Sequence, residues 1–246
     1  MGTIIIQENI KANGGVVLKR FLSWTLGIIA CFGLLFMLFF LSFHFCLNDD
    51  GWFKTELYRL DTARKSGHRL TELTDALDTA QTRLSGNTDA SGDLSSRELS
   101  MLDAVAKPVS VARIAFFISA GVCALFFLTV PFALRREWIL VFSRSCIISA
   151  GVFIIPATAL MVAIGTSFSW LTAWARYLFA LPAKLSSDSL LGALFSDNLL
   201  YDLISRALKI GLVLTLILLA AAIAFLVIRA KRRRSAVLAS GKKQTR

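Results

Sequence analysis

The chain has 246 residues, of which 56% are hydrophobic, and its 27 basic and 16 acidic residues give a formal net charge of +11. It contains no Gly-rich phosphate-binding loop, no Gly-x-Ser-x-Gly motif and no His or Cys cluster with metal-ligand spacing. Soluble-enzyme classes are therefore not indicated, and we expect no metal and no cofactor. The basic residues gather at the ends of apolar segments, which membrane topology explains without a nucleic-acid partner.

Four apolar segments without charged residues are close to or above the ~20 residues that a helix needs to cross ~30 Å of hydrocarbon. They are residues 21–47, 114–134, 145–167 and 210–228. We therefore predict an all-α polytopic membrane protein with four transmembrane helices. The remaining parts are an N-terminal tail (1–20), a first loop (48–113), a short turn (135–144), a second connection (168–209) and a basic tail (229–246).

The distribution of basic residues between these connections predicts the orientation of the chain. The two tails and the short turn together hold 14 basic and two acidic residues, whereas the two longer connections hold 13 basic and 14 acidic residues. Short segments rich in Lys and Arg stay in the cytoplasm. We therefore expect both termini to be cytoplasmic and both longer connections to be extracytoplasmic. The run Lys-Arg-Arg-Arg (231–234) is also expected to attract anionic lipid.

The first apolar segment follows a basic tail, as the apolar part of a signal peptide does. At residues 21–47 it is too long for a signal peptide, and no small-x-small cleavage site follows it. We therefore expect an uncleaved membrane anchor. Cys31, Cys123 and Cys146 lie inside apolar segments, so we interpret them as small core residues and not as part of a disulfide framework.

Four leucines recur at helical spacing in the first loop, and such a stripe predicts an amphipathic helix. They are Leu70, Leu73, Leu77 and Leu84. After a polar linker (85–93), Ser95 and Glu98 have the spacing of a capping box, in which each side chain accepts a backbone N–H of the other residue. We expect a second helix from here to about Lys107, with an interruption at Pro108 before the second span.

The second connection is nearly as apolar as a span, but charges and Pro182 interrupt it, which predicts an interfacial helix. Its apolar residues at helical spacing are Leu190, Leu191, Leu194, Phe195, Leu199, Leu200 and Leu203. Trp170, Trp174 and Tyr177 stand where an aromatic belt is expected. Two interpretations of the segment stay open: it serves simply as an anchor of the bundle at the headgroups, or it forms a lipid-access surface on the outer leaflet. Two interpretations also stay open for Asp188, Asp202 and Arg206, which either form a site or merely solvate the interfacial helix.

Two segments carry a resemblance to a known family. One reads Arg-Glu-Leu-Ser-Met-Leu-Asp-Ala-Val (97–105) and is similar to a family segment Arg-Glu-x-x-His-Met-x-Asp-Val just before the second span. The other (188–202) is similar to a stretch with Asp, a Leu-Ile pair, Leu-Phe-Pro-Glu, two aromatics and Asp before the fourth span. With the four-span layout, these segments resemble the lipoprotein intramolecular transacylase (Lit) family of the bacterial cytoplasmic membrane. The positions that match the family motifs are Arg97, Glu98, Asp188 and Asp202.

The resemblance implies a reaction in which an acyl chain moves from the diacylglyceryl group of a lipoprotein cysteine onto that cysteine's own α-amine. Such a reaction requires a base for the amine and donors for the oxyanion, and the family is associated with two outer-face histidines. This chain has Met101 at the first of these positions and Trp-Ala-Arg-Tyr-Leu-Phe (174–179) around the second. It also has its acid one place early, at Asp103, and Ser196 in place of the family proline.

The only histidines of the chain, His44 and His68, both fall on the outer side of the expected topology. They are candidates for a relocated base, and Tyr177 is a third candidate. The ordinary interpretation is that His44 is a hydrogen-bonded residue at a helix end and that His68 lies on a solvated loop face.

Three hypotheses follow for the function. The chain could be a divergent Lit-like protein that binds lipid or lipoprotein at the outer leaflet, or an acyltransferase with relocated residues. It could also be a structural or partner-binding four-helix membrane protein without lipid chemistry. A transporter is not indicated, because translocation paths usually expose ionisable groups within the spans, and apart from His44 the four spans contain none.

Overall fold

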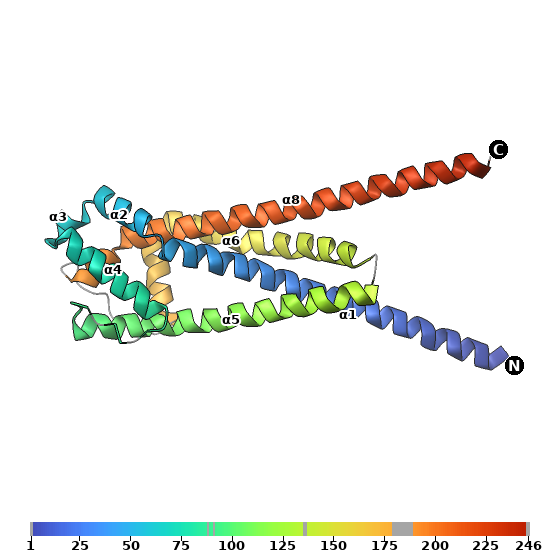
Figure 1. Ribbon diagram of the computed structural model, residues 1–246, viewed down its shortest axis with the longest axis horizontal. Helices are drawn as coiled ribbons and strands as arrows, with labels where there is room; N and C mark the ends of the chain where they lie inside the picture. Colours follow the sequence, from blue (N-terminus) through green and yellow to red (C-terminus); the bar gives the residue numbers. More distant parts are fainter. Residues whose placement is uncertain (1, 88, 91, 135–136, 179–188, 245–246) are drawn as a thin grey trace. The chain divides into compact units, whose positions relative to one another are not determined.

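The computed structural model describes residues 2–87, 89–90, 92–134, 137–178 and 189–244, and these residues form helices and turns without a strand. Four of the helices are long (Figure 1). They are α1 (Gly2–Leu47), α5 (Ser96–Leu134), α6 (Trp138–Leu178) and α8 (Asp197–Gln244). The four shorter helices are α2 (Asp50–Arg59), α3 (Thr62–Ser66), α4 (Leu70–Leu84) and α7 (Leu190–Leu194).

Each long helix contains a segment that is long and apolar enough to cross a bilayer. These segments are Phe21–Leu47, Ser96–Leu134, Trp138–Trp170 and Asp197–Arg232. At most 28% of the residues in their most apolar windows are buried inside the protein. Large side chains such as Phe132 and Ile155, which are 83% and 72% exposed, therefore face outward, where a lipid environment suits them. The prediction of an all-α polytopic membrane protein with four spans is confirmed.

The chain divides into two compact units. Unit 1 consists of residues 1–37, 118–155 and 213–246, and unit 2 of residues 38–117 and 156–212. Unit 1 therefore contains parts of the four long helices. Unit 2 contains the other parts of these helices together with α2, α3, α4 and α7.

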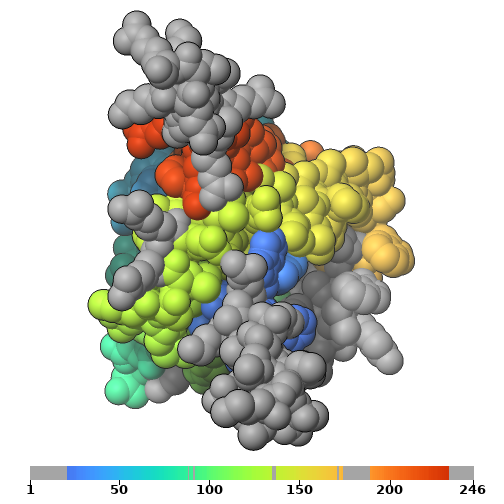
Figure 2. Space-filling view, turned by 90° about the vertical axis from the view of Figure 1, so that its right-hand side faces the viewer, coloured from blue at the N-terminus to red at the C-terminus, as the bar shows by residue number. Residues whose placement is uncertain are grey.

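The core of unit 1 lies where small side chains let helices approach closely. Blue side chains of α1 lie next to the green and yellow side chains of α5 and α6 in Figure 2. Phe126 is fully buried at this contact, and the Cys31 and Cys146 sulfurs are 3.3 Å apart. Cys123 donates to the Ala30 carbonyl at 3.2 Å. All four cysteines of the chain are free and buried, as expected for small core residues.

Gly27 lies at a close helix contact in unit 1, and its substitution is expected to destabilise the bundle. A Cβ at this position would lie 2.8 Å from Ser145 Oγ and 3.3 Å from side chains of Phe126 and Val141. We expect Gly27→Val to cost about 1–3 kcal/mol of stability through overpacking. Gly121→Val is the matched control, because no atom lies within 4 Å of a Cβ there. Thermal unfolding in detergent compares the two, and equal melting temperatures would contradict close packing at Gly27.

The core of unit 2 joins the short helices to the neighbouring parts of α1, α5 and α8. Its most buried large side chains include Phe53, Leu57, Leu73, Leu194, Leu199 and Leu203, each at most 2% exposed. Of the leucine stripe expected from the sequence, Leu73, Leu77 and Leu84 are buried on one face of α4. The amphipathic helix is therefore confirmed, and its apolar face packs on protein.

The interruption expected at Pro108 is wrong, because α5 is continuous from Ser96 through this residue to Leu134. Pro108 lacks an N–H and removes one helical hydrogen bond. Val105 and Val109, on either side of it, pack against the core of unit 2 and hold the helix in place. A long helix tolerates proline where neighbouring elements support it in this way.

Candidate functional site

The Glu98 carboxylate joins two segments that are far apart in the chain. It is only 4% exposed and accepts hydrogen bonds from Ser95 N at 2.8 Å and Ser95 Oγ at 2.7 Å. Glu98 N in turn donates to Ser95 Oγ at 3.4 Å, which confirms the expected capping box. The other carboxylate oxygen accepts from Leu191 N at 2.8 Å. Glu98 therefore ties the first residues of α5 to α7, the helix inside the second motif-like segment.

Met101 lies on the same turn of α5 but in an apolar environment. It packs against a cluster that includes Leu102 and Leu191, and Leu102 is 3% exposed. A thioether in such a cluster neither accepts nor releases a proton at neutral pH. The position that the Lit resemblance assigns to a histidine therefore holds a packing residue in this chain.

A pair of charged residues lies at the junction of α2 and α8 in unit 2. Asp49 caps α2 by accepting from Trp52 N at 3.1 Å, and its second oxygen accepts from Arg206 Nη2 at 2.8 Å. The Arg206 guanidinium carbon lies 5.2 Å from the centroid of the Trp52 ring. Arg206 Nη1 is buried and has no hydrogen-bond partner among the described residues. Both charged side chains are about 30% exposed, at 27% and 31%.

A second group of charges lies beside this pair. Arg59 Nε donates to Glu56 at 2.5 Å, and Arg59 Nη2 donates to Asp202 of α8. The adjacent cleft has a volume of about 310 Å³. Its lining consists of Trp52, Glu56, Tyr201, Asp202, Ser205, Arg206, Lys209 and Ile210. The structure thus assigns Asp202 and Arg206, whose roles the sequence left open, to one ionic cleft between α2 and α8.

The stability of the α2–α8 junction is expected to depend on pH through Asp49. The Trp52 N–H, and then the Arg206 guanidinium, hold the pKa of this carboxyl below its ordinary value of 3.8. A folded-state pKa below the unfolded one contributes stability that is present above pH 3.8 and is lost as the pH falls through the folded pKa. Asp49→Asn keeps a capping side chain but removes the charge, so the melting temperatures of mutant and wild type should converge below pH 3.8. A difference that stays constant from pH 6 to pH 3 would contradict this assignment.

The two histidines each pair with a residue four positions further along the chain. Asn48 Nδ2 lies 3.2 Å from His44 Nδ1 and also donates to the His44 carbonyl at 2.7 Å. His68 Nδ1 lies 3.6 Å from Glu72 Oε2. His44 is exposed in an open groove of about 590 Å³ lined by Leu41, His44, Phe45, Asn48, Asp49 and Asp50. These are the partners expected of structural histidines. Of the two, His44 lines a groove formed by described residues.

Several residues of interest fall outside the described part of the chain. Asp188 and Pro182 are not described, and the side chains of Trp174 and Tyr177 are not described either. Trp170 is 61% exposed on α6, and the backbone of α6 departs from helical geometry at Ser167 (φ −151°, ψ 53°). The roles expected for Asp188 and Tyr177 therefore stay predictions.

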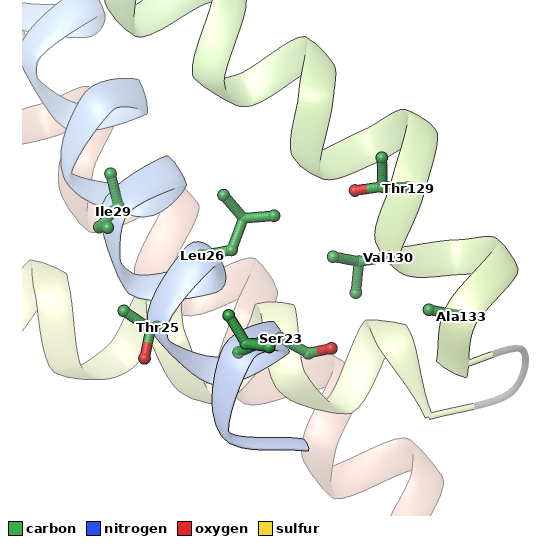
Figure 3. A pocket seen from close by; sticks show the side chains of 8 residues that line it. Ser23, Thr25, Leu26, Ile29, Thr129, Val130 and Ala133 are labelled. Atoms are coloured by element: carbon green, nitrogen blue, oxygen red, sulfur yellow. The ribbon is translucent and has the colours of Figure 1, made fainter. Parts of the chain in front are cut away.

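Unit 1 has a groove of its own between α1 and α5, with a volume of about 320 Å³. Leu26 and Val130 project between the two helices (Figure 3). The hydroxyls of Thr25 and Thr129 donate to the carbonyls of Phe21 and Leu125 in their own helices. This groove is therefore mainly apolar, and its two threonine hydroxyls are engaged within their own helices.

The fold and these sites define an all-α integral membrane protein with four spans and a polar, ion-paired helical unit. Comparison with protein-family models and with curated proteins finds no match. Among solved structures, the chain is similar to the membrane-integral lipoprotein intramolecular transacylase Lit from Bacillus cereus, with a TM-score of 0.68 and 12% identity. The similarity covers 87% of this chain and 99% of the Lit chain.

Two further Lit structures from Bacillus cereus, each with a substitution at one histidine, give the same result. Their TM-scores are 0.66 and 0.68 at 15% and 13% identity, over 93% and 89% of this chain and 99% of each Lit chain. At such low identity the similarity establishes a shared fold. The structural relationship expected from the sequence is thereby supported, and membership of the sequence family is not shown.

Proposed function

We propose that this chain is a divergent Lit-like protein that binds lipoprotein, or lipid of similar acyl content, at the outer leaflet without histidine-dependent acyl transfer. The observation that carries the proposal has two parts. The fold of this chain matches 99% of the Lit chain, but the position that the resemblance assigns to a histidine holds Met101 in an apolar cluster. The fold supports a lipid-related role, and the missing proton carrier argues against the family chemistry.

The contacts of Glu98 give further support. Through Leu191 N, this carboxylate connects the two segments that resemble the Lit motifs, so these segments contact each other in this chain. The presence of a glutamate at position 98 thus has a structural explanation, because a buried carboxylate with three hydrogen-bond donors stabilises the fold whether or not the protein catalyses a reaction. The topology that places this unit on the outer side is part of the proposal.

Acyl transfer by a relocated base is the second candidate, and the groove around His44 is the observation that favours it. His44 is exposed there beside Asp49 and Asp50, with the apolar side chains of Leu41 and Phe45 on the same groove. A lipid-linked amine could approach such a histidine from the bilayer. The side-chain amide of Asn48, which lines the groove, is directed at the His44 ring and the His44 carbonyl, and this makes acyl transfer the weaker candidate.

Mass spectrometry of lipoproteins from cells with and without the protein tests the proposal. We expect an unchanged N-terminal acylation pattern together with diacylated lipoprotein that co-purifies with the tagged protein. A changed acyl pattern would instead support transfer, and then His44→Ala should abolish the change while His68→Ala, as the matched control, should not. If neither a changed pattern nor co-purification is found, the protein has a structural or partner-binding role and the proposal fails.

A further inference from the structure

The cleft between α2 and α8 has basic residues next to the apolar part of α8 and acidic residues further from it. A lipid headgroup with a phosphate and an ammonium has the complementary order of charges. We propose that the cleft binds a zwitterionic aminophospholipid, which has a phosphate and a primary ammonium in one headgroup. The proposal goes beyond the lipoprotein-binding function above, because a diacylglyceryl lipoprotein has no phosphate. It concerns residues of unit 2 alone.

The order of residues along α8 is the first observation. Ile210 begins the apolar run of this helix, and the next positions outward on the cleft are Lys209, then Arg206, then Asp202. Asp202 and Arg206 are four residues apart and thus about one turn, or ~6 Å, from each other along the helix. A phospholipid has the same order, since its acyl chains are followed by the phosphate and then, two carbons further out, by the ammonium. The match holds on whichever side of the membrane the unit lies.

The inner end of the cleft is suited to the phosphate. Lys209 is exposed, and no acidic side chain in the described part of the chain pairs with it. Arg206 uses Nη2 for Asp49 and has Nη1 without a hydrogen-bond partner among the described residues. Arginine and lysine are the usual partners of phosphate oxygens. These two residues therefore provide a positive end with hydrogen-bonding capacity that the described contacts do not use.

The outer end of the cleft is suited to the ammonium. Glu56 and Asp202 both pair with the single guanidinium of Arg59, so this group of three retains one net negative charge. The Glu56 and Asp202 side chains are 14% and 28% exposed. A primary ammonium has three N–H donors for such carboxylates. A quaternary ammonium has no N–H, and a glycerol headgroup has no positive charge, so both fit this end less well.

The walls of the cleft are those of a headgroup site. Trp52 comes from α2, and Tyr201 from α8 packs edge-on against Phe168 with the ring centroids 5.6 Å apart. Amphipathic aromatic rings of this kind concentrate at the level of the headgroups in membrane proteins. The volume of about 310 Å³ accommodates a headgroup without its acyl chains.

Native mass spectrometry of the purified full-length chain tests the proposal with three lipids that share the same acyl chains. We expect phosphatidylethanolamine to be retained about threefold or more over phosphatidylcholine and phosphatidylglycerol, a preference in the range of partly exposed ion pairs. Equal retention of the three lipids would overturn the proposal. Because no lipoprotein is present, this result is independent of the outcome of the lipoprotein experiment.

Two substitutions that should change the lipid preference differently sharpen the test. Lys209→Gln should reduce retention of both phosphatidylethanolamine and phosphatidylglycerol, because both have the phosphate. Asp202→Asn should weaken phosphatidylethanolamine and shift the preference toward phosphatidylglycerol, because the cleft becomes net positive. Lys54→Gln is the matched control, since Lys54 is an exposed lysine of α2 that does not line the cleft. A Lys54→Gln effect as large as that of Lys209→Gln would indicate general surface attraction and contradict a site.

Discussion

Replacing Phe53 with Ala is expected to lower the free energy of unfolding by about 3–5 kcal/mol, the range for an aromatic side chain removed from a packed core. Phe53 is 0% exposed and lies in the main apolar cluster of unit 2, with Trp52 against its edge at a centroid distance of 5.0 Å. Its loss would leave a cavity between α2 and the helices that pack on it. Denaturant titration in mixed micelles, followed by circular dichroism, measures the change.

The matched control for Phe53→Ala is Tyr58→Ala on the same helix. Tyr58 is 70% exposed, so its truncation should change the stability by no more than about 0.5 kcal/mol. If the two variants unfold at the same denaturant concentration, α2 is not packed on unit 2 as the structure has it. The ionic cleft would then lose its α2 wall, and the headgroup assignment would fail with it.

Replacing Glu98 with Ala is expected to cost about 2–4 kcal/mol, because Ser95 N and the buried Leu191 N lose their acceptor together. Glu98→Gln retains one carbonyl oxygen and should fall between the wild type and Glu98→Ala. Both values come from the same denaturant titration. The effect should appear even in a variant that binds no lipid, since the carboxylate has a structural role.

Glu72→Ala is the control for the Glu98 variants, because Glu72 is also a capping glutamate. It accepts from Arg69 N at 3.0 Å, but its side chain is 44% exposed, so water can replace the lost bond. We expect a loss of about 1 kcal/mol or less. A Glu98→Ala cost no greater than that of Glu72→Ala would show that the bond to Leu191 contributes nothing, and the two motif-like segments would then be independent.

The sequence predicted those parts of the structure that local patterns determine. The four apolar segments identified the four spans, the leucine stripe identified α4, and the S-x-x-E spacing identified the bonds between Ser95 and Glu98. Each of these patterns lies within one helix or its first turn. The break expected at Pro108 failed because the packing of Val105 and Val109 on another part of the chain supports the helix there.

The ionic cleft could not be predicted from the sequence, because its contacts join distant residues. Arg206 and Asp49 are separated by 157 positions, and Arg59 and Asp202 by 143. The residues next to Asp202 and Arg206 in the sequence do not indicate whether these side chains line a cleft or are simply exposed to solvent. The third bond of Glu98 is similar, since its partner Leu191 is 93 positions away. Charge pairing of this kind depends on the tertiary fold.

The side of the membrane on which unit 2 lies tests the central claim most directly, because lipoprotein binding at the outer leaflet requires unit 2 to be extracytoplasmic. Asp78→Cys on α4 provides an exposed label site in unit 2. Lys243→Cys places a cysteine in the basic tail of the sequence. The four natural cysteines are buried and give a low background. In intact cells, a membrane-impermeant maleimide should label Asp78→Cys, and it should label Lys243→Cys only after permeabilisation. Labelling of both positions in intact cells, or of Lys243→Cys alone, would contradict the account.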